Sequence, residues 1–146
     1  MALYVLIKGL KIPPSQIDFA TSGKAALCKL LQAIGEQESS KQRGEGDPLA
    51  NFGREEESIP QEVTSTIEAL IQKSKILDRV TPEDFGLPSR SFSQECGYSL
   101  ILTDCSMPSM DGYQCTKFAS ALLRLTNVRT PPKIVAVTGH IEPEYQ

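Results

Sequence analysis

The sequence predicts an α/β fold built around a parallel sheet, because short apolar runs of strand length alternate with longer stretches of helical spacing. Residues 99–103 form a mostly apolar run followed by Asp104, and residues 134–137 form a second run followed by Thr138. Runs of this kind are typical of strands buried on both faces. A chain of 146 residues is long enough for one such domain, and we expect residues 1–146 to form it.

The first part of the chain predicts a helix, a strand and a second helix. Residues 2–10 are apolar with helical spacing, residues 16–20 alternate like a strand, and helical spacing returns at Gly23. Four side chains of this second helix recur at intervals of three and four residues, which places them on one face: Leu27, Leu30, Leu31 and Ile34. Gly35 is a typical helix stop.

The middle of the chain differs in composition. Residues 36–54 are polar with hardly any apolar side chain, which predicts a mobile loop because such a segment cannot offset the entropy of ordering. A helix is expected near residues 60–77, with Pro60 suited to its first turn. A short helical turn is expected at 81–84, and residues 86–97 are again loop-like.

Composition and charge exclude several classes of function. Fifteen basic and eighteen acidic residues give a net charge of −3, without a basic cluster, so direct nucleic-acid binding is not expected. The longest apolar run near the N-terminus, residues 2–7, is far shorter than a membrane span. The four cysteines lack the paired spacing of a structural zinc site. We expect a cytoplasmic protein with free thiols.

The chemistry concentrates where the two apolar runs end. In open parallel sheets, ligands bind beyond the carboxyl ends of the strands, so Asp104 and Thr138 are expected to face the same crevice. A carboxylate there can attack a phosphoryl group and form an acyl phosphate, provided that donors or a cation offset the oxygen charges. The Thr138 hydroxyl and the Gly139 backbone N–H could serve as two such donors.

Residues 104–112 read Asp-Cys-Ser-Met-Pro-Ser-Met-Asp-Gly, which resembles the phosphorylation-site loop of response-regulator receiver domains. Residues 135–140 are similar to the switch strand of that family. The resemblance covers residues 1–34 and 98–146, and it leaves residues 35–97 as an insertion. It implies an incomplete flavodoxin-like (CheY-like) parallel sheet sandwich.

The resemblance also implies roles for individual residues. Asp104 would be the phosphoacceptor, the Ser106 carbonyl a magnesium ligand, and Thr138 the switch hydroxyl. Backbone groups expected to bind the phosphate are those of Cys105, Ser106 and Gly139. Residues expected to shape the loop are Pro108, Asp111 and Gly112, of which Asp111 is best interpreted as a helix N-cap.

Two parts of the receiver pattern are not found in this sequence. The acidic pair that helps to hold Mg²⁺ would end a first strand before residue 2, and the last strand with its lysine would follow residue 146. We therefore expect a sheet without the family's first and last strands. We also expect weak Mg²⁺ binding, through Asp104 and Ser106 alone.

Two hypotheses follow for function. The first is a non-enzymatic phosphorelay module, resembling the receiver of a hybrid histidine kinase, that accepts a phosphoryl group on Asp104 from a histidine kinase or phosphotransfer domain. The second is a pseudo-receiver that serves as an interaction module independently of phosphorylation. An aspartate-nucleophile phosphatase is disfavoured, because Ser106 stands where such enzymes carry a second aspartate.

Overall fold

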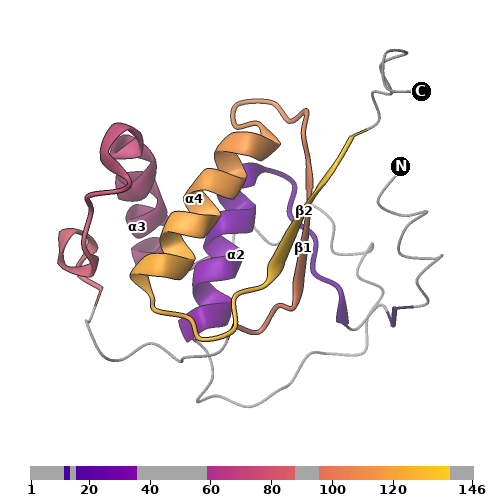
Figure 1. The fold of residues 1–146 in the computed structure, drawn as a ribbon, viewed down its shortest axis with the longest axis horizontal. Coiled ribbons are helices and arrows are strands. Elements are labelled where there is room, and N and C mark those ends of the chain that lie inside the picture. The colour runs from indigo at the N-terminus through magenta and orange to yellow at the C-terminus, as the bar shows by residue number, and fades with distance from the viewer. Residues whose placement is uncertain (1–11, 14–15, 36–58, 88–95, 139–146) are drawn as a thin grey trace.

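The computed structural model describes residues 12–13, 16–35, 59–87 and 96–138 (Figure 1). Its helices are α2 (Gly23–Gly35), α3 (Gln61–Gln72) and α4 (Gly112–Leu125), with short 3₁₀ helices η3 (Ser74–Ile76) and η4 (Pro82–Phe85). Its strands are β1 (Leu100–Asp104) and β2 (Lys133–Val137). The predicted α/β class is confirmed: a small parallel sheet packs against helices.

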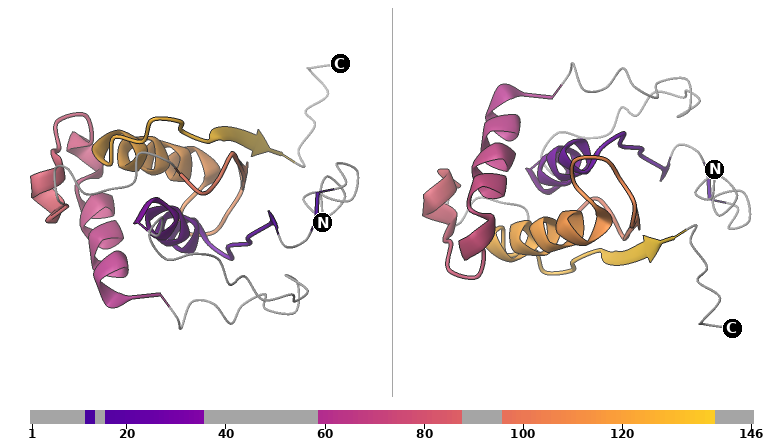
Figure 2. Two further views of the ribbon diagram at one scale, coloured as in Figure 1. Left: turned by 90° about the horizontal axis from the view of Figure 1, so that it is seen from below. Right: turned by 90° about the horizontal axis from the view of Figure 1, so that it is seen from above.

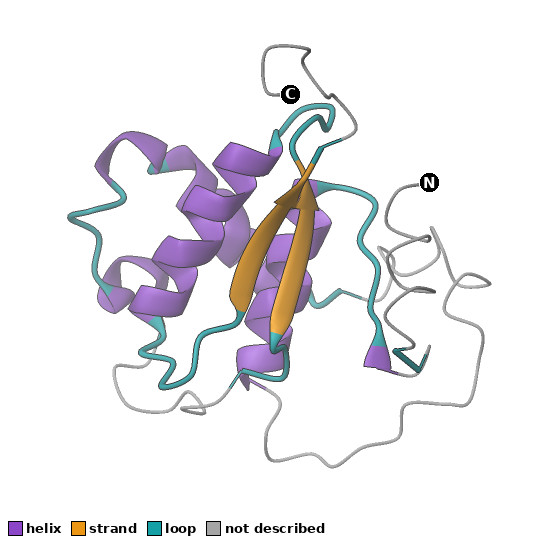
Figure 3. Cartoon of the chain, turned by 45° about the vertical axis from the view of Figure 1, so that its right-hand side comes forward, coloured by secondary structure: helices purple, strands orange, loops and turns teal. Residues whose placement is uncertain are grey.

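The two strands form where the sequence predicts them. They pair in parallel, with Leu100 opposite Lys133 and Asp104 opposite Val137, and α4 connects the end of β1 to the start of β2. This arrangement is the strand–helix–strand unit that parallel pairing requires. Both strands therefore end at the same edge of the sheet, where Figure 3 shows their arrowheads side by side.

The core lies between the sheet and the helices, and α2 is central to it. The four α2 side chains predicted to share a face are all buried: Leu27, Leu30, Leu31 and Ile34. They belong to one cluster that includes Phe118 and Leu122 of α4. Figure 2 shows α2 and α4 as a layer between the sheet and α3.

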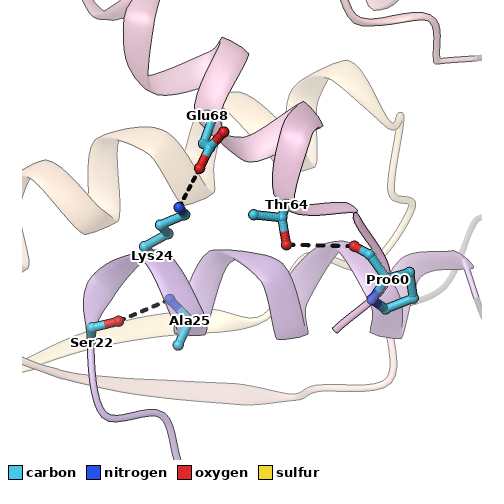
Figure 4. A network of polar contacts seen from close by, with 6 residues as sticks. All are labelled: Ser22, Lys24, Ala25, Pro60, Thr64 and Glu68. Carbon is cyan, nitrogen blue, oxygen red and sulfur yellow. Dashed lines mark hydrogen bonds and ion pairs between the residues drawn. The ribbon is translucent and has the colours of Figure 1, made fainter. Parts of the chain in front are cut away.

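Helix α3 packs against α2 through Ile67 and Leu70, which are almost fully buried. One polar contact between the two helices accompanies this packing: Lys24 Nζ lies 2.5 Å from Glu68 Oε1 (Figure 4). At the start of α2 itself, the Ala25 N–H donates to Ser22 Oγ. The described part of the predicted insertion thus covers the core of this fold, as amphipathic helices usually do.

The end of α3 differs from its prediction. The sequence predicts a helix to about residue 77, but α3 ends at Gln72 and the chain tightens into η3. The Lys73 N–H is shared between the carbonyls of Ala69 and Leu70, which is the usual transition from α to 3₁₀ geometry. Leu77 is buried all the same, and Arg124 donates to its carbonyl at 2.6 Å.

The short turn expected at 81–84 is present as η4. Thr81 and Asp84 form a capping box, in which the Thr81 N–H donates to Asp84 Oδ2 at 2.8 Å. Gly86 ends the turn with φ 63°, a left-handed conformation that glycine adopts without a steric penalty. None of the described helices is both long and apolar enough to cross a membrane.

The prediction of a strand at residues 16–20 is wrong. Gln16 donates to the Pro13 carbonyl in a turn, and residues 17–20 have no regular secondary structure although they run beside β1 (Figure 3). Side chains hold this segment instead of a backbone ladder: the Tyr98 hydroxyl donates to Asp18 at 2.5 Å, and the Lys29 ammonium donates to the Phe19 carbonyl. A strand needs a neighbour in hydrogen-bonding register, and the described sheet contains only β1 and β2.

Other predictions fall on residues that the structure does not describe. These are the helix at 2–10, the loop at 36–54, much of the loop at 86–97, and Gly139.

Candidate functional site

Asp104 is the last residue of β1, and its side chain is exposed. The preceding Thr103 is buried, so the strand carries the chain out of the core directly to the carboxylate. One residue further on, the Cys105 N–H donates to the Val137 carbonyl at 3.1 Å, continuing the hydrogen bonding beyond the last strand residue. The carboxylate is therefore attached to backbone that the sheet holds in place.

The Asp104 carboxylate is oriented by the loop that follows it. Its Oδ1 accepts a hydrogen bond from the Ser106 backbone N–H at 2.9 Å. A carboxylate that accepts from the N–H two residues later forms an Asx turn, a local arrangement that aspartate favours.

Gly112 lets the start of α4 lie directly against the end of β1. A Cβ on Gly112 would lie 2.3 Å from the Asp104 carbonyl oxygen and 3.0 Å from Cys105 Cα. The Gly112 N–H also donates to the Cys105 carbonyl at 3.3 Å. Only glycine permits this close approach, which closes the loop between the strand and the helix.

Asp111 caps α4 rather than facing the strand end. Its Oδ1 accepts from the Gln114 N–H at 2.7 Å, and the Gln114 side chain accepts from the Asp111 N–H at 3.2 Å. The pair is a capping box, which satisfies two donors that would otherwise lack partners at the helix start. The Asp111 carboxylate thus has a structural role as the N-cap of α4.

The loop itself is anchored by a contact that the motif alone does not reveal. Met110 is buried, and its Sδ lies only 2.8 Å from where a Cβ on Gly23 would stand. Pro108 is exposed, its carbonyl accepts from the Met110 N–H at 2.8 Å, and Ser109 takes a positive φ of 69°. The glycine at the start of α2 is the only sequence signal of this contact, and by itself it does not predict which residue packs against it.

Thr138 lies at the same sheet edge as Asp104. It is exposed and immediately follows Val137, which is the register partner of Asp104. Asp104 is opposite Val137, so regular strand alternation would place the side chains of positions 104 and 138 on opposite faces, and Thr138 lies one residue beyond the last residue of β2. The two predicted residues are thus neighbours at adjacent strand ends.

The described residues do not complete a magnesium site. Over the described ranges, no three side chains of the histidine, cysteine, aspartate or glutamate type gather as metal ligands. The predicted ligands, the Asp104 carboxylate and the Ser106 carbonyl, follow one another closely in the loop. They supply only part of the near-octahedral oxygen set that Mg²⁺ requires, so we derive no chemical step through a metal ion.

Burial distinguishes the thiols near this site. Burial raises the pKa of the Cys115 thiol, which lies on the inner face of α4 with its Sγ 3.9 Å from the Gly23 carbonyl. Cys105 is half-buried in the loop next to Asp104. The Cys115 thiol therefore stays protonated as part of the core.

Comparison with known proteins adds no relative. No protein-family model, no curated protein and no solved structure matches this chain. The fold and the site define only a coarse class: a mixed α/β protein whose described residues form two parallel strands, with an exposed aspartate at the end of the first.

Proposed function

We propose that the chain is a receiver module of the response-regulator type, which accepts a phosphoryl group on Asp104 in a cytoplasmic phosphorelay. The observation that carries the proposal is the exposed carboxylate at the carboxyl end of a parallel strand, hydrogen-bonded to the Ser106 N–H and adjacent to the strand end that bears Thr138. Ligand sites in open α/β sheets occupy this position.

The proposed reaction is transfer from a phosphohistidine on a histidine kinase or phosphotransfer domain. An Asp104 carboxylate oxygen attacks phosphorus, the new O–P bond forms as the N–P bond breaks, and the departing imidazole nitrogen keeps the electron pair. The Ser106 N–H, which donates to Asp104 Oδ1, supports this step, and we expect the Thr138 hydroxyl at the end of the neighbouring strand to act as a second donor to the developing phosphoryl charge. The step balances without any further reactant.

The product would change the charge at one sheet edge. An acyl phosphate replaces a single negative charge at Asp104 with a larger one and adds acceptor oxygens. We expect the hydroxyl of Thr138, which follows the neighbouring strand, to donate to the new acceptors. A local change of hydrogen bonding at β2 would then be the output of the module.

A second candidate is a pseudo-receiver that binds a partner protein without being phosphorylated. One observation favours it: among the described residues, Asp104 does not belong to any group of three potential metal ligands. Receiver phosphorylation depends on a cation, and a site with too few oxygen ligands would react slowly or not at all.

Incubation of the chain with a small phosphodonor and Mg²⁺, followed by intact mass measurement, decides between these candidates. We expect one phosphoryl adduct that hydroxylamine removes, as it does from acyl phosphates, and we expect none on the Asp104→Asn variant. Asp78→Asn is the matched control, since Asp78 is an exposed carboxylate between η3 and η4 and should leave the adduct unchanged. An unmodified wild-type chain would favour the pseudo-receiver, and an adduct that persists in Asp104→Asn would refute phosphorylation at this residue.

A further inference from the structure

The β1–α4 loop, residues 105–111, is tied together at its two ends. The Gly112 N–H donates to the Cys105 carbonyl at 3.3 Å, and the Asp111 side chain caps α4. Between these ends lies Ser106, whose N–H orients the predicted nucleophile. Because the ends are fixed, the position of this N–H depends on what holds the middle of the loop.

A single buried side chain attaches the middle of the loop to the core. All residues of the β1–α4 loop are described, and Met110 is the one among them that is buried, as a member of the core cluster. Met107 is half-buried, whereas Ser106, Pro108 and Ser109 are exposed. A buried apolar side chain is held by contacts on several sides, which an exposed one lacks. Met110 is therefore the main attachment of the loop.

Met110 is linked to the exposed part of the loop by a tight turn. Its N–H donates to the Pro108 carbonyl at 2.8 Å across Ser109, which has a φ of 69°, so these three residues form a turn of the γ type. On the other side of Met110, Gly112 lies directly against the backbone of β1 and has no room to move. A displacement of Met110 is thus transmitted through the turn toward Ser106.

Gly23, at the start of α2, forms the seat of Met110. A Cβ on Gly23 would lie 2.8 Å from Sδ, 3.1 Å from Cγ and 3.2 Å from Cβ of Met110, so three consecutive atoms of the methionine lie along the glycine. Among the described glycines a positive φ occurs at Gly86 and not at Gly23, so the backbone conformation of Gly23 does not require glycine. Contact with Met110 is what leaves no room for a side chain at this position.

We propose that Met110, seated on Gly23, is a positioning residue for phosphoryl transfer to Asp104. By holding the middle of the β1–α4 loop, Met110 fixes the Ser106 N–H, and this N–H fixes the rotation of the carboxylate that attacks phosphorus. Reaction rates depend steeply on such geometry, since a misplacement of about 1 Å can cost roughly 100-fold. The effect on the rate rests on the proposed function, whereas the effect on the Ser106 N–H does not.

Gly23→Ala tests the seat. Ordinary contact begins at about 3.5 Å, so the new Cβ would push Met110 Sδ by about 0.7 Å and Met110 Cβ, which moves only with the backbone, by about 0.3 Å. With acetyl phosphate and Mg²⁺, we expect the rate of adduct formation to fall about 3- to 10-fold under conditions where circular dichroism shows the variant folded. Gly97→Ala is the matched control, because its Cβ would meet Ala33 of the same helix at 3.6 Å and should leave the rate unchanged. Equal rates in the two variants would overturn the proposal.

The amide resonance of Ser106 provides a readout that does not depend on phosphorylation. This N–H donates to Asp104, so the Asp104→Ala variant defines the chemical shift of the N–H without its acceptor. In Gly23→Ala the signal should move toward that value, and in Gly97→Ala it should keep its wild-type position. A signal that does not move in Gly23→Ala would refute the role of Met110 in placing this N–H.

Met110→Ala removes the attachment without creating a clash, and it provides the test if Gly23→Ala does not fold. It should slow adduct formation at least as much as Gly23→Ala does, and it should move the Ser106 signal in the same direction. In the double variant the new methyl group at position 23 enters space that the methionine has left, so the double variant should be no slower than Met110→Ala alone. Effects that multiply would show that the two positions act independently, and the proposal would fail. If the wild-type chain forms no adduct, the proposed function fails, and the Ser106 signal alone decides whether Met110 positions the loop.

Discussion

Gly112→Ala should destabilise the chain, although alanine is the better helix former. The new Cβ would stand 2.3 Å from the Asp104 carbonyl oxygen, about 1.2 Å inside the optimal separation of roughly 3.5 Å for non-bonded heavy atoms. Its neighbours are backbone atoms of Asp104 and Cys105, which cannot rotate away as a flexible side chain would. The start of α4 must therefore move away from the end of β1.

The size of the effect follows from three contributions. Overpacking of this kind costs about 1–3 kcal/mol. The movement weakens the hydrogen bonds from Gly112 to Cys105 and from Cys105 to Val137, each worth about 0.5–1.5 kcal/mol. The higher helix propensity of alanine returns at most about 1 kcal/mol. We expect the free energy of unfolding to fall by roughly 3 kcal/mol, which urea titration followed by circular dichroism can measure.

Gly97→Ala is the control for this substitution. A Cβ on Gly97 would meet its nearest atom, Ala33 Cβ, at 3.6 Å, which is an ordinary contact. Alanine restricts the unfolded chain more than glycine does, so this substitution should leave the free energy of unfolding unchanged or raise it by about 0.4–1 kcal/mol. Hydrogen exchange at the Cys105 amide should quicken in Gly112→Ala alone. If the two alanine variants prove equally stable, the close approach of α4 to β1 is not a constraint on this fold.

Two further predictions concern α4. Asp111→Ala removes the side-chain acceptor of the Gln114 N–H and should lower the free energy of unfolding by about 1 kcal/mol in the same titration, whereas Asp111→Asn should retain most of the stability. Burial raises the pKa of Cys115, so the folded state holds that proton to higher pH than the unfolded state does, and stability should decline as the pH rises above the ordinary thiol pKa. Cys115→Ser should remove that part of the alkaline decline, and an unchanged pH profile would show that another group causes it.

The elements that could be predicted from the sequence are those whose signal is local. The two strands are short apolar runs bounded by polar residues, and the buried face of α2 follows from the spacing of Leu27 to Ile34. These apolar side chains are stabilised by burial, so their spacing in the sequence predicts which face of the element is buried. The position of Asp104 at a strand end follows from the same local pattern.

The elements that could not be predicted depend on partners distant in the sequence. Residues 17–20 alternate like a strand, but strand formation depends on a neighbour in register, and here Tyr98 and Lys29 bind the segment through side chains instead. The contact of Met110 with Gly23 joins the loop before α4 to the start of α2, two segments that are far apart in the chain, and no periodicity reveals it. In both cases, tertiary packing determines a structure that the local sequence pattern does not predict.

The same geometry explains why chemistry and stability can be separated at this site. Asp104 is exposed, and the hydrogen bond that Oδ1 accepts from the Ser106 N–H can be preserved by the amide oxygen of asparagine. Gly112 contributes through backbone contact alone, whereas Asp104 offers a nucleophilic oxygen that the fold does not need. A loss of phosphorylation in Asp104→Asn with unchanged stability would thus report on the nucleophile, while a loss in Gly112→Ala would report on the position of the strand that carries it.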